Sequence, residues 1–247
     1  MTMAPLERLV PGGRVELIFN LSEPMTFMMT CDSLKGNDFA HTYIMGQRNK
    51  VYYAKQNGDT HLLGVRFKPG GISAFTKIPT AVFLNELVSA EDVLGIVCKE
   101  WKERLLDMKS DDERINLLDT LILKIVKDPA KEWSSCNRAM DVIRSGDFRS
   151  VNALCDKGVS YYKRLERDFL QHIGYTPKYY HRIVRFNRAI RLMYSNENSL
   201  TTIGHACNYY DQSHFIKDFR QFTGSTPSHF MKEDHAIADA LIKNQVV

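Results

Sequence analysis

The chain has 247 residues, of which 44% are hydrophobic and 25% charged, a composition typical of a globular protein with room for two domains. No run approaches the roughly 18 apolar residues of a membrane span, and residues 1–11 lack the features of a secretion signal, so we expect a cytoplasmic protein. The formal net charge of +4 is unevenly distributed. Residues 134–233 carry 15 Lys and Arg against 9 Asp and Glu, whereas residues 1–133 carry 17 against 18. A basic segment beside a neutral one is typical of a polyanion binder.

The five cysteines lie far apart, with no CxxC pair and no grouping with histidine at metal-ligand spacing. Such a set is typical of reduced, buried thiols, so neither disulfides nor zinc are expected. His41 and His61 each stand alone, which favours surface or structural roles over metal binding. The sequence also lacks a phosphate-binding loop, a dinucleotide-binding glycine motif and a nucleophile elbow. We therefore expect no enzyme activity and no cofactor.

The first ninety residues are predicted to be rich in β-strands. Runs of β-branched, aromatic or alternating residues occupy 15–19, 42–45, 50–54 and 61–67, and turn-forming segments separate them. The pair Asn57-Gly58 lies between the last two runs. Because both residues tolerate positive φ, the pair predicts a hairpin at this point.

Helical periodicity follows Pro69-Gly70-Gly71, with helices predicted at 71–76, 91–108 and 110–127. The last has a capping box, with Ser110 as the N-cap and Glu113 three residues later. The sequence therefore predicts an α+β fold. Its parts are a β-rich sensor or dimerisation domain over 1–133, with helices at about 91–127, an all-α domain over 134–233, and a tail over 234–247.

The all-α part contains an internal repeat at an offset of 50 residues. Leu165, Phe169, Gly174, Thr176 and Pro177 recur as Phe215, Phe219, Gly224, Thr226 and Pro227. Each copy is predicted to have a short helix (150–156, then 200–207), a turn and a second helix (161–173, then 212–222). The glycine and proline mark the end of the second helix in each copy. A helix over 178–194, about 25 Å long, joins the copies, and a short helix over 139–145 precedes them.

Two helices joined by a tight turn form a helix-turn-helix, whose second helix enters the major groove of DNA. Helical periodicity places the repeated apolar residues on the buried side of each second helix. The residues expected to point outward are Lys163, Glu166 and Arg167 in the first copy, and Ser213, His214, Lys217, Arg220 and Gln221 in the second. Two such units on a rigid helix fit successive major-groove turns about 34 Å apart.

Residues of about 136–233 resemble the DNA-binding domain of the AraC family of bacterial transcription regulators. The second unit carries the family motif as Ile203, Tyr209-Tyr210-Asp211-Gln212-Ser213-His214-Phe215, Phe219 and Thr223-Gly224-Ser225-Thr226-Pro227; the first carries Leu165-Glu166-Arg167, Phe169, Gly174, Thr176-Pro177 and Arg182-Ile183-x-Arg185-Phe186.

The chain departs from the family pattern at three positions. Gly204 replaces an alanine, at a cost of up to about 1 kcal/mol in helix propensity. Asn208 replaces a glycine in the turn, where asparagine tolerates a left-handed backbone. Tyr161 stands where a serine usually caps the first recognition helix, and Ser160 is expected to cap it one residue earlier.

The resemblance implies which residues contact DNA. These are Tyr162, Lys163, Glu166 and Arg167 in the first unit, and Gln212, Ser213, His214, Lys217 and Arg220 in the second. Four arginines on the connecting helix, at 182, 185, 188 and 191, resemble a basic rail, but local salt bridges are the preferred interpretation for most of them.

The resemblance also implies partners and a role for the N-terminal half. Residues 5–90 resemble the cupin-like sensor of many family members, which implies a small-molecule effector, and the helices at 91–127 resemble a dimerisation segment that allows a homodimer. The implied function is an activator-type, sequence-specific regulator that binds promoter DNA and contacts RNA polymerase, with no membrane partner. Two alternatives stay open: a non-specific architectural DNA binder, and a small-molecule-binding protein with a vestigial DNA domain.

Overall fold

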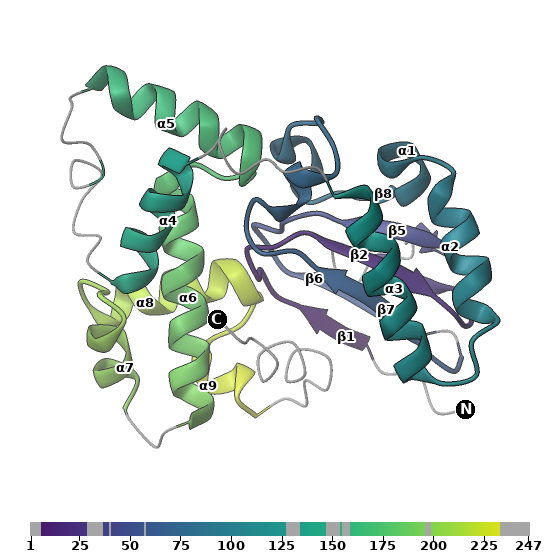
Figure 1. The fold of residues 1–247 in the computed structure, drawn as a ribbon. Coiled ribbons are helices and arrows are strands. Elements are labelled where there is room, and N and C mark those ends of the chain that lie inside the picture. Colours follow the sequence, from purple (N-terminus) through teal and green to yellow (C-terminus); the bar gives the residue numbers. More distant parts are fainter. Residues whose placement is uncertain are drawn as a thin grey trace.

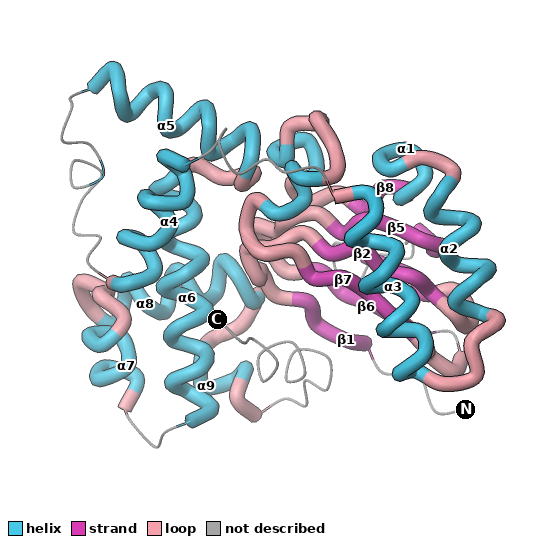
Figure 2. Tube along the Cα trace, in the orientation of Figure 1, coloured by secondary structure: helices cyan, strands magenta, loops and turns pink. Residues whose placement is uncertain are grey.

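The computed structural model describes residues 6–28, 37–39, 41–56, 58–126, 134–146, 154, 159–195 and 199–232. Its strands gather in one half of the molecule and the helices α4 to α9 form the other half (Figures 1 and 2). This arrangement confirms the predicted α+β fold class. The predicted tail over 234–247 and most of the predicted helix over 150–156 lie outside the described residues.

Two antiparallel four-stranded sheets make up the β-rich half. One has the order β1-β6-β3-β4 and the other β7-β2-β5-β8. The strands are β1 (Leu6–Leu9), β2 (Glu16–Asn20), β3 (Met25–Met28), β4 (Asn37–Phe39), β5 (Thr42–Met45), β6 (Tyr52–Gln56), β7 (Leu62–Arg66) and β8 (Leu87–Ser89).

The second sheet is covered on both faces. Leu17, Phe19 and Ile44 pack in one core with side chains of the helices after the sheets, whereas Tyr43 and Met45 pack in another core with residues of β1, β3 and β6. Successive side chains of a strand point to opposite faces, so β5 is buried along its whole length. The second core lies between the two sheets.

The hairpin predicted at Asn57-Gly58 is wrong. β6 pairs with β1 and β3 in one sheet, whereas β7 pairs with β2 in the other. The chain between them therefore crosses from sheet to sheet, and Asn57 itself lies outside the described residues. A turn-forming dipeptide predicts a change of direction, but the pairing of these strands is decided by partners far away in sequence.

The helices after the sheets differ in part from expectation. The predicted helix at 71–76 is a 3₁₀ helix over Gly71–Ala74, and another 3₁₀ helix covers Thr80–Phe83. The single helix predicted over 91–108 is wrong, because Gly95, at φ 89°, separates α1 (Ala90–Leu94) from α2 (Val97–Leu106). α2 and α3 (Asp111–Ile125) lie across the second sheet (Figure 1).

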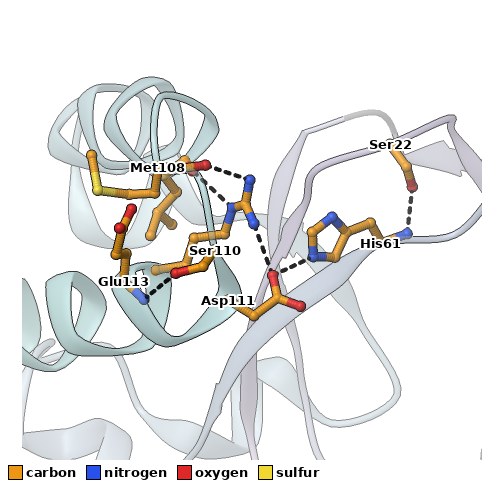
Figure 3. Close-up of polar contacts among 8 residues, drawn as sticks. Ser22, His61, Met108, Ser110, Asp111 and Glu113 are labelled. Atoms are coloured by element: carbon orange, nitrogen blue, oxygen red, sulfur yellow. Dashed lines mark hydrogen bonds and ion pairs between the residues drawn. The ribbon is translucent and has the colours of Figure 1, made fainter.

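The start of α3 is fixed by polar contacts that Figure 3 shows. The Ser110 hydroxyl accepts a hydrogen bond from the Glu113 backbone N–H at 3.3 Å, which confirms the predicted cap. The Asp111 carboxylate contacts His61 Nε2 at 3.0 Å and Arg114 at 2.9 Å. Because His61 comes just before β7, these contacts tie the helix to the sheet. His61 therefore has a structural role.

The described residues of the second half form helices joined by turns, with no strand among them. These helices are α4 (Ser134–Ser145), α5 (Val159–His172), α6 (Pro177–Ser195), α7 (Leu200–Ala206), α8 (Gln212–Thr223) and α9 (Pro227–Phe230). The predicted helices of 161–173, 178–194, 200–207 and 212–222 are thereby confirmed to within two residues at each end, whereas α4 begins five residues earlier than expected. Cys136 and Cys207 are buried here, and Cys98 is buried in the β-rich half.

The two halves meet where the turn between β5 and β6 touches the segment between α5 and α6. The Tyr175 hydroxyl donates to the Arg48 carbonyl at 2.6 Å, and the Tyr179 hydroxyl donates to the Asn49 carbonyl at 3.1 Å. The Gln47 side-chain amide donates to the Ile173 carbonyl. Val10 joins the core of the helical half. The interface is therefore both hydrogen-bonded and apolar.

Candidate nucleic-acid interface

The first recognition helix is α5. Leu165 and Phe169 are buried, and Phe169 contacts Tyr180 of α6 edge-to-face. The side chains of Lys163 and Arg167 are exposed, whereas those of Tyr162 and Glu166 are half-buried. This pattern of burial confirms which face of the helix was predicted to point inward and which outward. The cap predicted at Ser160 is wrong, because the helix already begins at Val159 and Ser160 lies in its first turn.

In the second unit, α7 and α8 are joined by a tight turn. Asn208 has φ 58°, so the left-handed turn predicted there is confirmed. Asp211 caps α8, its carboxylate accepting from the His214 backbone N–H at 2.7 Å. Phe215, Phe219 and Phe222 are fully buried. Gln212, Ser213, Lys217, Arg220 and Gln221 are exposed, and His214 is half-buried.

Three of the outward side chains of α8 have partners within the protein, and one of these is Gln221, which accepts a hydrogen bond from Arg182 at 2.6 Å. Gln212 accepts a hydrogen bond from the Thr201 hydroxyl of α7 at 3.1 Å. His214 lies edge-on to Tyr209, with ring centroids 5.4 Å apart. These contacts limit the freedom of these side chains before any ligand arrives. Ser213, Lys217 and Arg220 remain the outward residues with the greatest freedom in this unit.

A buried ionic cluster fixes α8 against α6. The Asp218 carboxylate contacts Arg182 at 2.7 Å and Arg185 at 2.8 Å. Burial alone would raise the pKa of Asp218, but the hydrogen bonds and positive charges of the two arginines outweigh it and hold the pKa below its ordinary value. Arg185 also lies over the Tyr209 ring, 3.9 Å from its centroid. The orientation of the second recognition helix is therefore set from α6.

These contacts divide the predicted basic rail into two pairs. Arg182 and Arg185 make the local salt bridges that were the preferred interpretation. Arg188 and Arg191 make no ion pair within the described part of the chain, and they face a groove toward the β-rich half. Sequence reasoning missed Asp218 as the counterpart of Arg182 and Arg185. The available signal was a lone acidic residue between Phe215 and Phe219 opposite an arginine-rich helix.

A separate, mostly apolar cavity of about 360 Å³ lies between the two sheets. Its lining includes Leu17, Met25, Phe27 and Tyr43, together with the guanidinium of Arg48. Arg48 is only 6% exposed, and its Nε has no hydrogen-bond partner. Its Nη2 donates to the Val10 carbonyl at 3.2 Å, and Nη1 lies against the Met45 sulfur. Arg48 was not identified from the sequence, because nothing local distinguishes it from a surface arginine.

The carboxylate that acts on Arg48, that of Glu16, lines the same cavity but is paired with Arg66, which lines it too. Glu16 forms an ion pair with Arg66 at 2.8 Å, although its charge still partly offsets the lowering of the Arg48 pKa that burial causes. A buried guanidinium without a carboxylate of its own is energetically unfavourable. The cavity therefore combines apolar walls with a buried cation, the Arg48 guanidinium, that can bind an anion.

Neither half suggests metal chemistry or a membrane span in the described residues. These residues include no cluster of three or more histidine, cysteine or acidic side chains arranged to hold a metal ion. None of their helices combines the length and apolar character needed to cross a bilayer.

Comparison with known proteins gives matches to each half. A family model described as a helix-turn-helix domain matches residues 158–233, and one described as a domain of unknown function (DUF6597) matches residues 3–89. The HTH-type transcriptional activator RhaS of Pectobacterium carotovorum is 37% identical over 65 residues, 26% of this chain and 23% of that protein. The HTH-type transcriptional regulator ArgR of Pseudomonas aeruginosa is 34% identical over 65 residues, 26% and 20% of the two chains.

These curated relatives are matched over about a quarter of their length or less. A structure of ToxT from Vibrio cholerae resembles nearly the whole fold, with a TM-score of 0.51 and 10% identity over 93% of this chain and 97% of that chain. The overall fold, a β-rich half beside a helical half, is thus shared with a protein of very different sequence.

Proposed function

We propose that this chain, whose C-terminal part is an AraC-type helix-turn-helix domain, is a sequence-specific DNA-binding transcription regulator. The observation that carries the proposal is the pair of recognition helices, α5 and α8, each with a buried aromatic or aliphatic stripe and an exposed basic side. Such helices enter successive major grooves. Promoter DNA and RNA polymerase are the proposed partners, activation is the proposed outcome, and a homodimer is the proposed assembly.

The proposed DNA contacts divide between base edges and phosphates. Long exposed cations such as Lys163, Arg167 and Lys217 can reach guanine edges or phosphates, whereas amide and hydroxyl side chains can read base edges. The full proposed set is Tyr162, Lys163, Glu166, Arg167, Gln212, Ser213, His214, Lys217 and Arg220.

Selection from a randomised DNA pool, followed by competition with unrelated DNA, tests the proposal on the full chain. A specific regulator enriches a motif with two halves and prefers it by about 10³-fold or more at physiological salt. Binding of all DNA with similar affinity would support the non-specific architectural DNA binder. No DNA binding at all would support a small-molecule-binding protein with a vestigial DNA domain. Arg104→Ala, which removes an exposed charge on α2, serves as the charge-matched control for Arg167→Ala.

The cavity between the sheets is the proposed effector site. Its apolar lining agrees with a partly apolar ligand, but Arg48 favours an acidic group over a fully uncharged molecule, because a carboxylate would provide the counter-ion that the guanidinium lacks. The same residue reaches the DNA-binding half, since its carbonyl accepts from Tyr175, which follows α5. Movement of Arg48 on ligand binding would therefore shift Tyr175 and, through it, the end of the first recognition helix.

Thermal unfolding of the full chain tests the effector site. Octanoate and 2-naphthoate are compared with the alcohols of the same skeletons. The acids are expected to raise the Tm by several degrees at about 100 times their Kd, and the alcohols are not. Equal shifts would contradict the role of Arg48. If no compound in a broader metabolite library shifts the Tm while the chain dimerises in sedimentation, the β-rich half is a dimerisation module instead.

A further inference from the structure

A second and larger groove, of about 740 Å³, separates the two halves of the molecule. We name it the interdomain groove. One wall comes from the segment before β2 and the segment after β7, and the other from the end of α4 and the face of α6 that Arg188 and Arg191 share. Six of the residues that line it are cationic: Arg14, Arg66, Lys68, Arg144, Arg188 and Arg191.

The positive charge of the groove is poorly compensated. Its lining contains no carboxylate among the described residues. Arg66 is paired with Glu16 outside the lining, and Arg144 lies 4.0 Å from the exposed Asp141. Arg14, Lys68, Arg188 and Arg191 form no ion pair with any described residue.

Repulsion between the two walls adds to this imbalance. Burial, together with the charges of the neighbouring Arg66 and Arg144, lowers the pKa of Arg14, although Glu16 and Tyr180 partly offset the shift. Cations from both halves therefore face one another across the groove. A bridging anion would remove an unfavourable interaction in addition to gaining contacts of its own.

We propose that the interdomain groove binds a small molecule that carries two or more phosphate groups and has the size of a nucleotide. Guanidinium groups bind phosphate through paired charge-assisted hydrogen bonds. Five arginines therefore fit a ligand with several phosphate groups better than a ligand with a single carboxylate. The groove volume lies in the usual range for ligand sites. Val184 and Leu192, which are half-buried, supply an apolar flank on α6 for the non-phosphate part of the ligand, whereas Tyr180 and Ile183 also line the groove but are almost fully buried.

This site shares Arg66 with the cavity between the sheets but no other lining residue, and its lining includes no residue of α5 or α8. Because its cations come from both halves, a bound polyanion would hold the halves in one relative orientation. DNA affinity is then expected to change when the groove is filled. DNA phosphates share the same chemistry, so the experiment must separate a free ligand from the DNA backbone.

Gly12 offers a substitution that tests the charge alone. A Cβ added there meets no atom within 4 Å, and its φ is not in the left-handed region. Gly12→Glu places a carboxylate in the groove, whereas Gly12→Gln has the same size and no charge. We measure binding of tripolyphosphate and of ATP to the full chain by calorimetry, at constant ionic strength, with sodium sulfate and adenosine as comparison ligands.

Both phosphate compounds are expected to bind more tightly than sulfate or adenosine. The Kd of both phosphate compounds is expected to rise by about tenfold or more in Gly12→Glu and in the double variant Lys68→Gln with Arg191→Gln. It is expected to stay within about twofold in the controls Gly12→Gln and Arg104→Gln. Absence of binding at millimolar ligand, or equal effects of Gly12→Glu and Gly12→Gln, would overturn the proposal.

Measuring DNA affinity on the same variants separates the two sources of phosphate. In one outcome, the double variant Lys68→Gln with Arg191→Gln weakens DNA binding and lowers its salt slope by about one per residue, while calorimetry detects no binding of tripolyphosphate or ATP to the parent chain. In that case the groove contacts the DNA backbone, and the small-molecule site is wrong. If DNA binding is absent in every variant including the parent, the transcription-regulator proposal fails, and the calorimetric result still decides the groove.

Discussion

The two recognition helices come from one repeated unit, yet they are held by different parts of the molecule. α8 is capped by Asp211 and fixed to α6 by Asp218 with Arg182 and Arg185, all within the helical half. The C-terminal end of α5 is instead held by the β-rich half. Thr80 donates to the His172 carbonyl at 2.9 Å, and Gln47 donates to that of Ile173.

This difference assigns different roles to equivalent helices. The last carbonyls of a helix have no partner within it. Side chains of the β-rich half satisfy the carbonyl of His172, the last residue of α5, and that of the next residue, Ile173. A change in the β-rich half can therefore reach α5 directly. The segment after α8 also contacts that half, because Arg8 of β1 donates to the Ser225 hydroxyl at 3.0 Å, but α8 is additionally fixed to α6 by its ionic cluster. Under the proposed function, we therefore expect the second unit to bind DNA in one fixed orientation and the first unit to respond to a ligand.

The largest expected effect comes from removing the centre of the α8 cluster. Asp218→Ala leaves Arg185, which is 9% exposed, as an uncompensated buried charge, and is expected to destabilise the protein by about 3 kcal/mol. The matched change in the first unit, Asp168→Ala, breaks only an exposed 4.0 Å contact with Arg164 and should cost less than about 1 kcal/mol. Urea unfolding measures both. Equal losses would contradict the asymmetry between the units.

The same cluster predicts an acid sensitivity centred on α6. Burial, followed by the nearby charge of Arg185, lowers the pKa of His181 from 6.5 to about 4. The unfolded chain therefore binds a proton below pH 6.5 that the folded chain does not, so stability is complete above pH 6.5 and declines until about pH 4. The full shift corresponds to about 3 kcal/mol, and because the imidazole is only half-buried, solvent screening reduces the expected loss to about 2 kcal/mol. His181→Gln should flatten this part of the stability curve; an unchanged pH profile would refute the assignment.

A pair of helix-ending glycines compares the two units more finely. Gly174 and Gly224 both have positive φ, at 84° and 76°. An added Cβ at Gly174 would lie 2.7 Å from the Gln47 side chain, whereas at Gly224 its nearest neighbours are at 3.6 Å. Alanine should cost about 1 kcal/mol at Gly224 from the backbone alone and about 2 kcal/mol at Gly174.

Thermal unfolding of the two alanine variants measures this difference. The variant Gly174→Ala with Gln47→Ala is the control for the contact, because it removes the side chain that the new methyl group would meet. If Gln47→Ala does not reduce the excess cost at position 174, the coupling of α5 to the β-rich half through this contact is refuted.

The smallest effect is a gain in stability. Gly204 lies within α7, and an added Cβ there would meet Phe215 at 3.7 Å, an ordinary van der Waals distance. Gly204→Ala is therefore expected to stabilise the protein by about 0.5–1 kcal/mol through helix propensity, seen as a higher urea midpoint at unchanged slope. A lower midpoint would mean that α7 cannot approach α8 with an alanine at this position.

The sequence predicted the helical half far better than the β-rich half. Periodicity and caps are local signals, so the helices, the glycine ends and the left-handed Asn208 could be derived from neighbouring residues. The strands β1, β3, β4 and β8 have three or four residues each and were missed. The pairing of β6 with β1 and β3 instead of β7 depends on contacts distant in sequence.

The candidate sites follow the same division. The outward faces of α5 and α8 could be assigned from spacing alone. Arg48, Asp218 and the cations of the interdomain groove could not, because each depends on side chains from segments 30 or more residues apart in sequence that meet only in the folded chain. The sequence indicated the excess of positive charge in the helical half and the row of arginines on α6, but not that Arg188 and Arg191 share a groove with cations of the β-rich half.

Footprinting on a selected DNA site tests the central claim that the two helices read separate halves. Lys217→Ala should remove protection in one half and Arg167→Ala in the other, each at a cost of about 1–3 kcal/mol if a base contact is lost, while Arg104→Ala leaves both halves protected. An added effector should alter protection in the Arg167 half first. Uniform weakening of both halves by either variant would contradict the account.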